Sequence, residues 1–325
     1  MKRRDVIAAL GGAMAMPFAA RAQQATPTIG FLHLGAPGPN ARRLAGFRKG
    51  LSEAGFVEGQ QVAIDYRWAE GRVERLSEFA ADLVRRQVSV IVTLSATQAA
   101  LAARAATRTI PIVFQVGSDP VAIGLVESLN RPGGNATGIS SLAAQILPKR
   151  IGFLRELVPS GGAIHVLANP SNPNAKTMAA ELANVAQSLK AEAHMLHAAN
   201  DAEIEAAFRR ISLKPNGVLV IGNDPTFFVR RGLLAKLARD HRVPTIAYER
   251  EFAVDGGLMT YGVKSEAAWE MAGGYVARIL KGEQPRNLPV VQASEFELVL
   301  NLQTAKALGL TVPATMQALA DEVIE

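Results

Sequence analysis

Two patterns of hydrophobic and polar positions alternate along this chain. Short runs rich in β-branched and other apolar residues, such as residues 28–34 (TIGFLHL), predict buried strands. Longer stretches follow in which apolar residues recur every three or four positions, as in residues 74–88, and these predict amphipathic helices. Strands that alternate with such helices are typical of βαβ units. The pattern therefore predicts an α/β fold built on parallel sheet.

The same order of strands and helices occurs twice. GPNARR at residues 38–43 corresponds to NPNAKT at residues 172–177, and both segments lie between a predicted strand and a predicted helix. Two later strands begin at Pro111 and Pro244, at nearly the same separation. Because a whole four-strand unit is repeated, we expect two similar lobes, each a parallel sheet flanked by helices, rather than one continuous sheet.

Ligands bind outside the carboxyl ends of parallel strands, so two such lobes facing each other predict a ligand cleft between them. We expect the helix at residues 264–282 to return from lobe two to lobe one, which makes the chain cross three times. The expected crossings are near residues 142–149, 262–264 and 293–301. The predicted division is 28–145 plus 263–292 for lobe one, and 146–262 plus 293–325 for lobe two.

The first 22 residues are typical of an export signal peptide. A basic start precedes an apolar stretch that is too short for a permanent membrane span, and Ala20-Arg21-Ala22 fits a small-x-small cleavage site. Arg3-Arg4 indicates the twin-arginine route, with the general secretory route as the alternative. Without this segment the formal net charge falls from +6 to +3, and no dense basic run is interleaved with aromatic residues. Nucleic acid is therefore not an expected partner.

The chain contains no cysteine. This composition excludes disulfides, thiol catalysis, cysteine-based metal sites and a lipid anchor on an N-terminal cysteine. Together with the signal peptide it predicts a monomer in the periplasm, without a cofactor or bound metal. His194 and His197 lie on a predicted strand, where their spacing directs them to opposite faces, so they are not expected to share a metal ion.

Four segments and the leader together resemble the TrpX-like group of ABC-transporter substrate-binding proteins. The segments are residues 111–140, 169–175 (NPSNPNA), 257–285 and 299–313 (VLNLQTAKALGLTVP). The resemblance implies the type I periplasmic binding protein fold, no catalysis, and delivery of a small solute to a membrane permease. Some members bind tryptophan or other aromatic amino acids, so an amino-acid-like solute is expected here.

The segment after the third strand is the first candidate for ligand contact. There Ser95, Ala96 and Thr97 separate an apolar strand from an alanine-rich helix. The unpaired N–H groups and partial positive charge of a helix start suit a ligand carboxylate. Helix capping alone also accounts for these residue types.

Three acidic residues at strand ends are candidate partners of a ligand ammonium. Asp119 and Asp224 each precede a proline, so each is either a helix cap or a cleft carboxylate. Glu249 follows an apolar strand and fits a cap less well, which favours an amine-binding role. For a zwitterionic solute, Ser95 and Thr97 are expected to bind the carboxylate, and Asp119 or Glu249 the ammonium.

Other candidates lie near the strand ends of lobe two. Tyr248 and Tyr261, with Phe227, are placed to stack on a flat ligand or simply to pack. Polar residues gather after the first strand of that lobe, where a tight turn demands similar residues: Asn169, Ser171, Asn172 and Asn174. His33 ends the first strand of lobe one, and we expect it to pack against the sheet rather than donate into the cleft.

Two other functions remain open. An exported hydrolase would need a reacting constellation, for which carboxylates such as Asp224 and Glu249 are the available pair. A sensory module would present its ligand state to a receptor instead of a permease. The best-supported expectation is a binding protein whose cleft closes on its solute.

Overall fold

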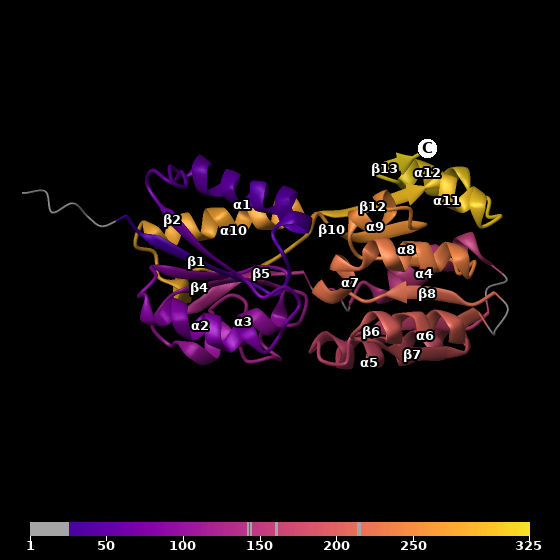
Figure 1. Ribbon diagram of the computed structural model, residues 1–325, viewed down its shortest axis with the longest axis horizontal. Coiled ribbons are helices and arrows are strands. Elements are labelled where there is room, and N and C mark those ends of the chain that lie inside the picture. Colours follow the sequence, from indigo (N-terminus) through magenta and orange to yellow (C-terminus); the bar gives the residue numbers. More distant parts are fainter. Residues whose placement is uncertain (1–25, 142, 144, 160–161, 213–215) are drawn as a thin grey trace, which may run out of the picture.

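Two separate β-sheets, each flanked by helices, lie side by side along the long axis of the molecule (Figure 1). The computed structural model describes residues 26–325 except for 142, 144, 160–161 and 213–215. The predicted signal peptide lies outside the described residues. We call the unit around the six-stranded sheet lobe one and the unit around the seven-stranded sheet lobe two. The two-lobed α/β architecture expected from the repeat is confirmed.

The sheet of lobe one has the order β11-β5-β4-β3-β1-β2, and its neighbouring strands run parallel. Its strands are β1 (Thr28–His33), β2 (Ala63–Trp68), β3 (Val90–Thr93), β4 (Ile112–Val116), β5 (Ala136–Ser140) and β11 (Val291–Gln292). Its helices are η1 (Gly38–Asn40), α1 (Ala41–Glu53), α2 (Arg75–Arg85), α3 (Thr97–Ala106), α10 (Ser265–Leu280) and η2 (Pro285–Asn287).

The sheet of lobe two has the order β13-β12-β10-β9-β8-β6-β7, in which β12 runs antiparallel to β10. Its strands are β6 (Ile164–Ala168), β7 (Ala193–His197), β8 (Val218–Ile221), β9 (Thr245–Ala247), β10 (Met259–Val263), β12 (Phe296–Asn301) and β13 (Glu322–Ile324). Its helices are α4 (Leu147–Leu157), α5 (Asn174–Leu189), α6 (Asp201–Ser212), α7 (Pro225–Val229), α8 (Arg231–Asp240), α9 (Arg250–Val254), α11 (Leu302–Ala307) and α12 (Ala314–Leu319). Within the described residues, no helix is both long enough and apolar enough to span a membrane.

The chain passes between the lobes after β5, after β10 and after β11. The third passage is shorter than the sequence suggested, because residues 296–301 form β12 instead of a connection. Leu298 and Leu300 of this strand are buried in the core of lobe two, which explains why the segment joins the sheet. The sheet of lobe two is therefore mixed and not wholly parallel.

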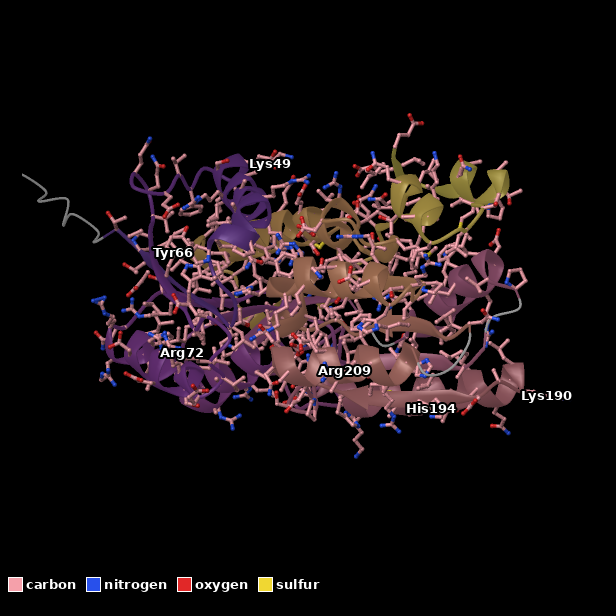
Figure 2. The ribbon with its side chains drawn as sticks, turned by 45° about the vertical axis from the view of Figure 1, so that its right-hand side comes forward. Lys49, Tyr66, Arg72, Lys190, His194 and Arg209 are labelled. Carbon is pink, nitrogen blue, oxygen red and sulfur yellow. The ribbon has the colours of Figure 1, made fainter. Side chains whose placement is uncertain are left out.

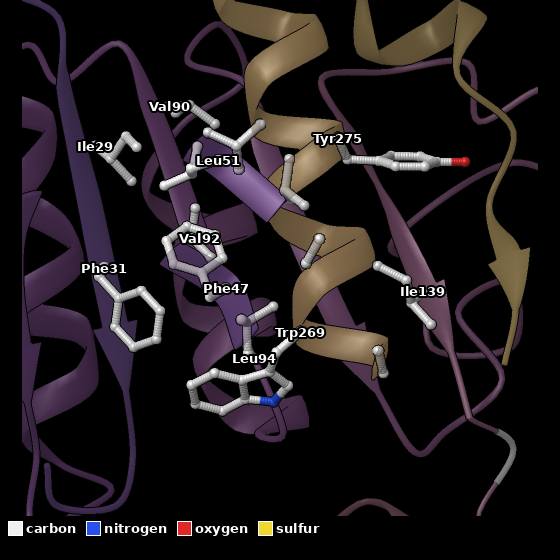
Figure 3. Close-up of a cluster of buried hydrophobic side chains, with 14 of the residues drawn as sticks. Ile29, Phe31, Phe47, Leu51, Val90, Val92, Leu94, Ile139, Trp269 and Tyr275 are labelled. Carbon is white, nitrogen blue, oxygen red and sulfur yellow. The ribbon is translucent and has the colours of Figure 1, made fainter. Parts of the chain in front are cut away.

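Each sheet is covered by apolar side chains on both faces, as expected for parallel strands between helices. Along β1, Ile29 and Phe31 point toward α1 and α10, where they join Phe47 and Trp269 (Figure 3). Leu32 belongs to the cluster on the opposite face, with residues of α2 and α3. The alternation along one strand thus fixes which side chains lie beneath each helix layer.

Helices α1 and α10 lie against each other in lobe one although more than two hundred residues separate them in the chain (Figure 1). Glycines allow their backbones to approach closely. A Cβ added at Gly50 would lie 1.9 Å from the carbonyl oxygen of Glu270, and one at Gly273 would lie 2.3 Å from that of Phe47. This packing fixes the position of α1, whose first turn faces lobe two.

Candidate functional site

A cavity lies where the two lobes meet, at the carboxyl ends of their central strands. Its empty space is about 260 Å³, part of it open to solvent. Lobe one contributes His33, Gly35, Asn40, Arg43 and Ser95, and lobe two contributes Asn223, Asp224, Pro225, Phe228 and Glu249. Two adjoining hollows share Asn223 and Asp224 with this cavity. The two hollows are lined by residues of lobe two alone and adjoin the interlobe cavity at Asn223 and Asp224.

His33 presents an uncharged hydrogen-bond donor in this cavity. The N–H of Gly35 donates to His33 Nδ1 at 2.8 Å, so the ring proton of the neutral imidazole must be on Nε2. Burial, together with the smaller effect of the positive charge of Arg43, lowers the pKa of His33 to about 3. Among the described residues, Nε2 has no hydrogen-bond partner. The ring packs beside Trp68 and Trp269, with centroids 4.9 and 5.7 Å away.

Asn40 presents an acceptor in the same cavity. Its Nδ2 donates to the carbonyl oxygen of Ala36 at 2.8 Å, which fixes the orientation of the amide. Its Oδ1 is buried and accepts no hydrogen bond within the part of the chain that the structure describes. A buried acceptor without a hydrogen bond costs free energy, and a ligand that donates to this oxygen would remove that cost.

Arg43 connects lobe one to lobe two. Its Nη2 lies 2.7 Å from Oε2 of Glu249 and 3.2 Å from Oε2 of Glu251. Its guanidinium carbon lies 3.9 Å from the centroid of the Phe228 ring. The side chain is only 2% exposed, and its Nε has no hydrogen-bond partner in the described ranges. Arg43 thus offers a second donor to the cavity while its other end is held by lobe two.

Glu249, the predicted amine partner, is held by both lobes. Besides Arg43, Ser265 Oγ donates to its Oε2 at 3.0 Å. Burial raises the pKa of Glu249, and the Arg43 charge acts against that rise. The residue lines the cavity as predicted, but as one half of an ion pair between the lobes.

The segment predicted to bind a carboxylate has a mainly structural arrangement. Ser95 lines the cavity, but its N–H and Oγ donate to Oε1 of Gln115 at 2.7 and 2.8 Å, and Trp269 Nε1 donates to its Oγ at 3.0 Å. Ala96 is the N-cap residue of α3, and Thr97 Oγ1 lies 3.3 Å from Ser118 Oγ. Because its hydroxyl proton is already used, Ser95 is a weaker donor for a ligand than we expected.

Asp224 is the N-cap of α7, which was one of its two predicted roles. Its Oδ1 accepts from the N–H of Thr226 at 2.7 Å and from Asn169 Nδ2 at 3.2 Å, and its Oδ2 accepts from Asn172 Nδ2 at 2.7 Å. Two residues of the predicted polar loop, Asn169 and Asn172, therefore hold the Asp224 carboxylate in place through hydrogen bonds. Asp224 still lines the cavity and both adjoining hollows.

Ser171 and Asn174 lie where the lobes touch. Gln98 Nε2 donates to the carbonyl oxygen of Ser171 at 3.5 Å, and Ser118 Oγ donates to Oδ1 of Asn174. Asn174 also lines the smaller adjoining hollow. These two residues therefore contribute to the contact between the lobes more than to the central cavity.

Two predicted residues lie elsewhere. Asp119 is exposed, and its Oδ1 accepts from the N–H groups of Val121 and Ala122, so it caps a turn. Tyr261 is packed in the core of lobe two, 5.1 Å from Phe153 between ring centroids, because β10 directs it beneath a helix. Tyr248 is buried beside the larger adjoining hollow, and Phe227 lines both hollows.

Residues 37–324 match the family model of the ABC transporter substrate binding proteins. The chain belongs to this family. The resemblance noted in the sequence is thereby confirmed, and the two-lobed fold is that of type I periplasmic binding proteins.

Relatives of this substrate-binding protein include proteins with named ligands. It is 29% identical over 265 residues to the "Tyrosine-binding protein" of Clostridioides difficile (strain R20291), across 82% of this chain and 76% of that protein. The solved ABC domain in complex with L-Trp from Streptococcus pneumoniae is 25% identical, with TM-score 0.84 and coverage of 92% and 100%. A ligand-free, open structure of a substrate-binding protein with adhesive properties from Clostridium difficile is 26% identical, with TM-score 0.68 and coverage of 92% and 99%.

Sequence reasoning missed six lining residues of this substrate-binding protein: Gly35, Asn40, Arg43, Asn223, Pro225 and Phe228. A signal for Asn40 was available, because the repeat aligns it with Asn174, which was selected. His33 was expected to pack against the sheet rather than donate into the cleft. It lines the cavity, and its Nε2 has no hydrogen-bond partner among the described residues. His194 lies on the edge strand β7 at the surface, with Nε2 at 2.8 Å from Glu192 Oε1 (Figure 2). Across the described ranges, no three His, Asp or Glu side chains converge as a metal site.

Proposed function

We propose that this protein is the periplasmic solute-binding component of an ABC importer and that it binds an aromatic amino acid between its lobes. The observation that carries the proposal is a set of buried polar groups on residues that line the cavity. Two buried donors, on His33 and Arg43, and one buried acceptor, on Asn40, have no partner among the described residues. These are the groups needed for a zwitterion.

The two donors suit the carboxylate of an amino acid. His33 Nε2–H is neutral and fixed in tautomer by Gly35, and Arg43 Nε–H is charged. Hydrogen bonds from such donors to a carboxylate are stronger when water is excluded, and both side chains are about 2% exposed. The carboxylate would also balance the charge that Arg43 brings to the cavity.

The ammonium group would lie toward Asn40 and the acids of lobe two. Asn40 Oδ1 supplies a neutral acceptor, and Glu249 supplies negative charge. Both hydrogen bonds that Glu249 makes to described residues end on Oε2. Asp224 accepts three hydrogen bonds, and an ionised carboxylate has about four lone-pair sites, so one remains for a ligand.

The aromatic side chain of the ligand would extend toward lobe two. Phe228 lines the cavity itself, and the adjoining hollow of about 290 Å³ of empty space is lined by Phe227, Tyr248 and Phe252. Ring-to-ring contacts favour a flat apolar group there. The ligands for which two relatives are named, tyrosine and L-Trp, support the same ligand class.

Binding without turnover is the best account of this chemistry. A histidine with a pKa of about 3 is too weak a base to abstract a proton near neutral pH. The carboxylate of Glu249 is paired with Arg43, and that of Asp224 is used by its hydrogen-bond donors. These groups are arranged to hold charge and not to move protons, which disfavours the hydrolase alternative.

Closure of the lobes around the solute and recognition of the closed form by a permease complete the proposal. The TM-score is 0.84 to the L-Trp complex but 0.68 to the open structure, at nearly equal sequence identity. This difference supports an arrangement of the lobes closer to a ligand-bound state. The export signal predicted at residues 1–22 supports a periplasmic location.

Isothermal titration with L-tyrosine, L-tryptophan and L-phenylalanine tests the ligand class. We expect binding at micromolar affinity or tighter by at least one of them. Tyramine lacks the carboxylate and 3-(4-hydroxyphenyl)propionate lacks the ammonium, so both should bind at least about tenfold more weakly than L-tyrosine. The recovered ligand should be chemically unchanged.

L-Alanine is the matched control for the aromatic ring, because it keeps both charged groups. Equal affinity for L-alanine and the aromatic amino acids would remove the ring from the proposal. Equal affinity for L-tyrosine and tyramine would remove the carboxylate assignment. Binding of none of the amino acids would reject the proposed ligand class.

A further inference from the structure

A second, strongly charged pocket lies directly behind the ligand cavity, on the side where the chain crosses between the lobes. It contains about 760 Å³ of empty space, much of it open to solvent. Arg43 and Glu249 line both spaces, so this ion pair separates them. The remaining lining residues are Arg42, Arg250, Glu251, Lys264, Ser265, Glu266, Ala267, Glu270 and Glu297.

The ion pairs that α1 makes around the charged pocket are of two kinds. Arg42–Glu266 and Lys49–Glu270, both at 2.8 Å, join α1 to α10 within lobe one. Lys49 projects from the surface of that lobe (Figure 2). Arg43, in contrast, reaches from α1 to Glu249 and Glu251 of lobe two.

The two kinds also differ in exposure to solvent. Side-chain exposure is 57% and 45% for Arg42 and Glu266, so water and salt weaken that pair. Arg43 is 2% exposed, Glu249 12% and Glu251 19%. Charges this deeply buried interact more strongly, and removing one partner leaves the other poorly solvated.

Among the described residues, the ion pairs and the ring contact that position the guanidinium of Arg43 come from lobe two. They are the two carboxylates on its Nη2 and the face of the Phe228 ring. They exist only while the lobes are together, and they leave Nε without a hydrogen-bond partner among the described residues. Separation of the lobes must therefore remove the groups that orient this donor.

We propose that Arg43 is a positioning residue that couples solute binding to lobe closure through Glu251 and Glu249. Formation of the interlobe ion pairs orients Nε toward the solute, and the solute carboxylate in turn stabilises the closed arrangement. Affinity therefore depends on Glu251, which lines the charged pocket but not the ligand cavity. The inference rests on the proposed solute site, but its first test needs no solute.

Glu251→Gln and Glu270→Gln form a matched pair of variants. Both remove one negative charge from the wall of the same pocket, but only Glu251 pairs across the lobes. Because the chain contains no cysteine, Ala105→Cys on α3 and Ala206→Cys on α6, both exposed positions, allow one spectroscopic label on each lobe. The distance between the labels reports lobe separation in the protein with and without L-tyrosine.

We expect Glu251→Gln to shift the distance distribution toward more separated lobes and to raise the dissociation rate of L-tyrosine by roughly three- to tenfold. Glu270→Gln should change neither quantity. Arg43→Gln should cause the larger loss, because it removes both the pairs and the donor. Arg43→Lys keeps the charge but not the forked guanidinium, so it should restore part of the closure and little of the affinity.

Identical distance distributions for the Glu251→Gln and Glu270→Gln variants would overturn the proposal. A faster dissociation of L-tyrosine from Glu251→Gln with an unchanged distance distribution would also contradict the proposal, because Glu251 would then affect affinity without changing lobe closure. If no amino acid binds, the proposed function fails, but the distances in the ligand-free variants still decide whether the ion pair holds the lobes together.

Discussion

The two lobes repeat one structural unit, but their polar side chains near the cavity differ in how they are hydrogen-bonded. Asn40 and Asn174 occupy matching positions at the start of the α-helix that follows the first strand of each lobe. In lobe one, Asn40 Oδ1 remains without a partner among the described residues. In lobe two, Asn174 Oδ1 accepts a hydrogen bond from Ser118 across the lobe boundary. One asparagine faces the solute site, and its counterpart joins the lobes.

The same contrast extends to the charged and ring-bearing residues. His33 in lobe one is oriented by one backbone N–H, and its other nitrogen has no partner in the part of the chain that the structure describes. Asp224 in lobe two accepts three hydrogen bonds from its own lobe. The comparison indicates that duplication sets the shape of the site, while the loops after the strands give each lobe different groups. In the proposed binding mode, lobe one supplies the unpaired donors and the Asn40 acceptor, and lobe two supplies the acids, the rings and the closing contacts.

The largest expected effect is on the free energy of unfolding. It compares a glycine in a helix of lobe one with a glycine in a helix of lobe two. Gly50→Ala should destabilise the protein by about 2–3 kcal/mol, because its Cβ would lie 1.9 Å from the Glu270 carbonyl oxygen and push α1 away from α10. Gly152 is exposed in the middle of α4, and a Cβ there meets open space among the described residues. Gly152→Ala should therefore stabilise by about 0.5–1 kcal/mol. Urea denaturation of both variants measures the two changes.

The next effect compares the two matching asparagines by titration with L-tyrosine. Asn40→Ala should weaken binding about tenfold or more, because an acceptor for the ligand ammonium is lost. Asn174→Ala should weaken it only about threefold, through the loss of one contact between the lobes. Equal losses of affinity at the two positions would show that both asparagines contribute equally to solute binding. That result would contradict the difference proposed between the lobes.

The smallest effect concerns pH. Burial raises the pKa of Glu297 to about 7, with Arg250 and Lys264 opposing the rise and Glu249 and Glu251 adding to it. The folded protein then binds this proton more tightly than the unfolded chain does. The resulting stability is complete below the usual pKa of 4.5 and is lost as the pH rises through about 7.

Glu297→Gln stays neutral, so its melting temperature should exceed that of the wild type by about 1–2 °C at pH 8 and match it near pH 5. The exposed neighbour Glu295 provides the control variant Glu295→Gln. A constant difference between Glu297→Gln and the wild type at both pH values would contradict the stated titration.

Much of the fold could be predicted because its signals are local. The apolar runs and helical periods located the central strands and the return of α10 to lobe one. Strand β12 of the lobe-two sheet was harder to predict from the sequence. Residues 296–301 were assigned to a crossing, because nothing in so short a segment says that it will pair antiparallel with β10. That pairing depends on burial of Leu298 and Leu300 in a core assembled from distant parts of the chain.

The site was predicted less completely because its main contacts connect distant segments. Arg43 lies in a polar turn of a helix, where an arginine ordinarily faces solvent, and its partner Glu249 is 206 positions away. Ser95 lines the cavity, but its hydrogen bonds to Gln115 and Trp269 could not be predicted from the spacing of residues in the sequence. Asp119 and Asp224 share an Asp-Pro motif, and only the tertiary structure shows that one is exposed and the other lines the cavity.

The most direct measurement of the central claim is a titration cycle on His33. His33→Phe keeps a flat ring between Trp68 and Trp269 but removes the donor on Nε2, and L-tyrosine and tyramine differ only in the carboxylate. We predict that the substitution weakens L-tyrosine about tenfold and leaves tyramine unchanged. An equal loss for both ligands would show that His33 shapes the cavity without binding the carboxylate, and would contradict the account of lobe one.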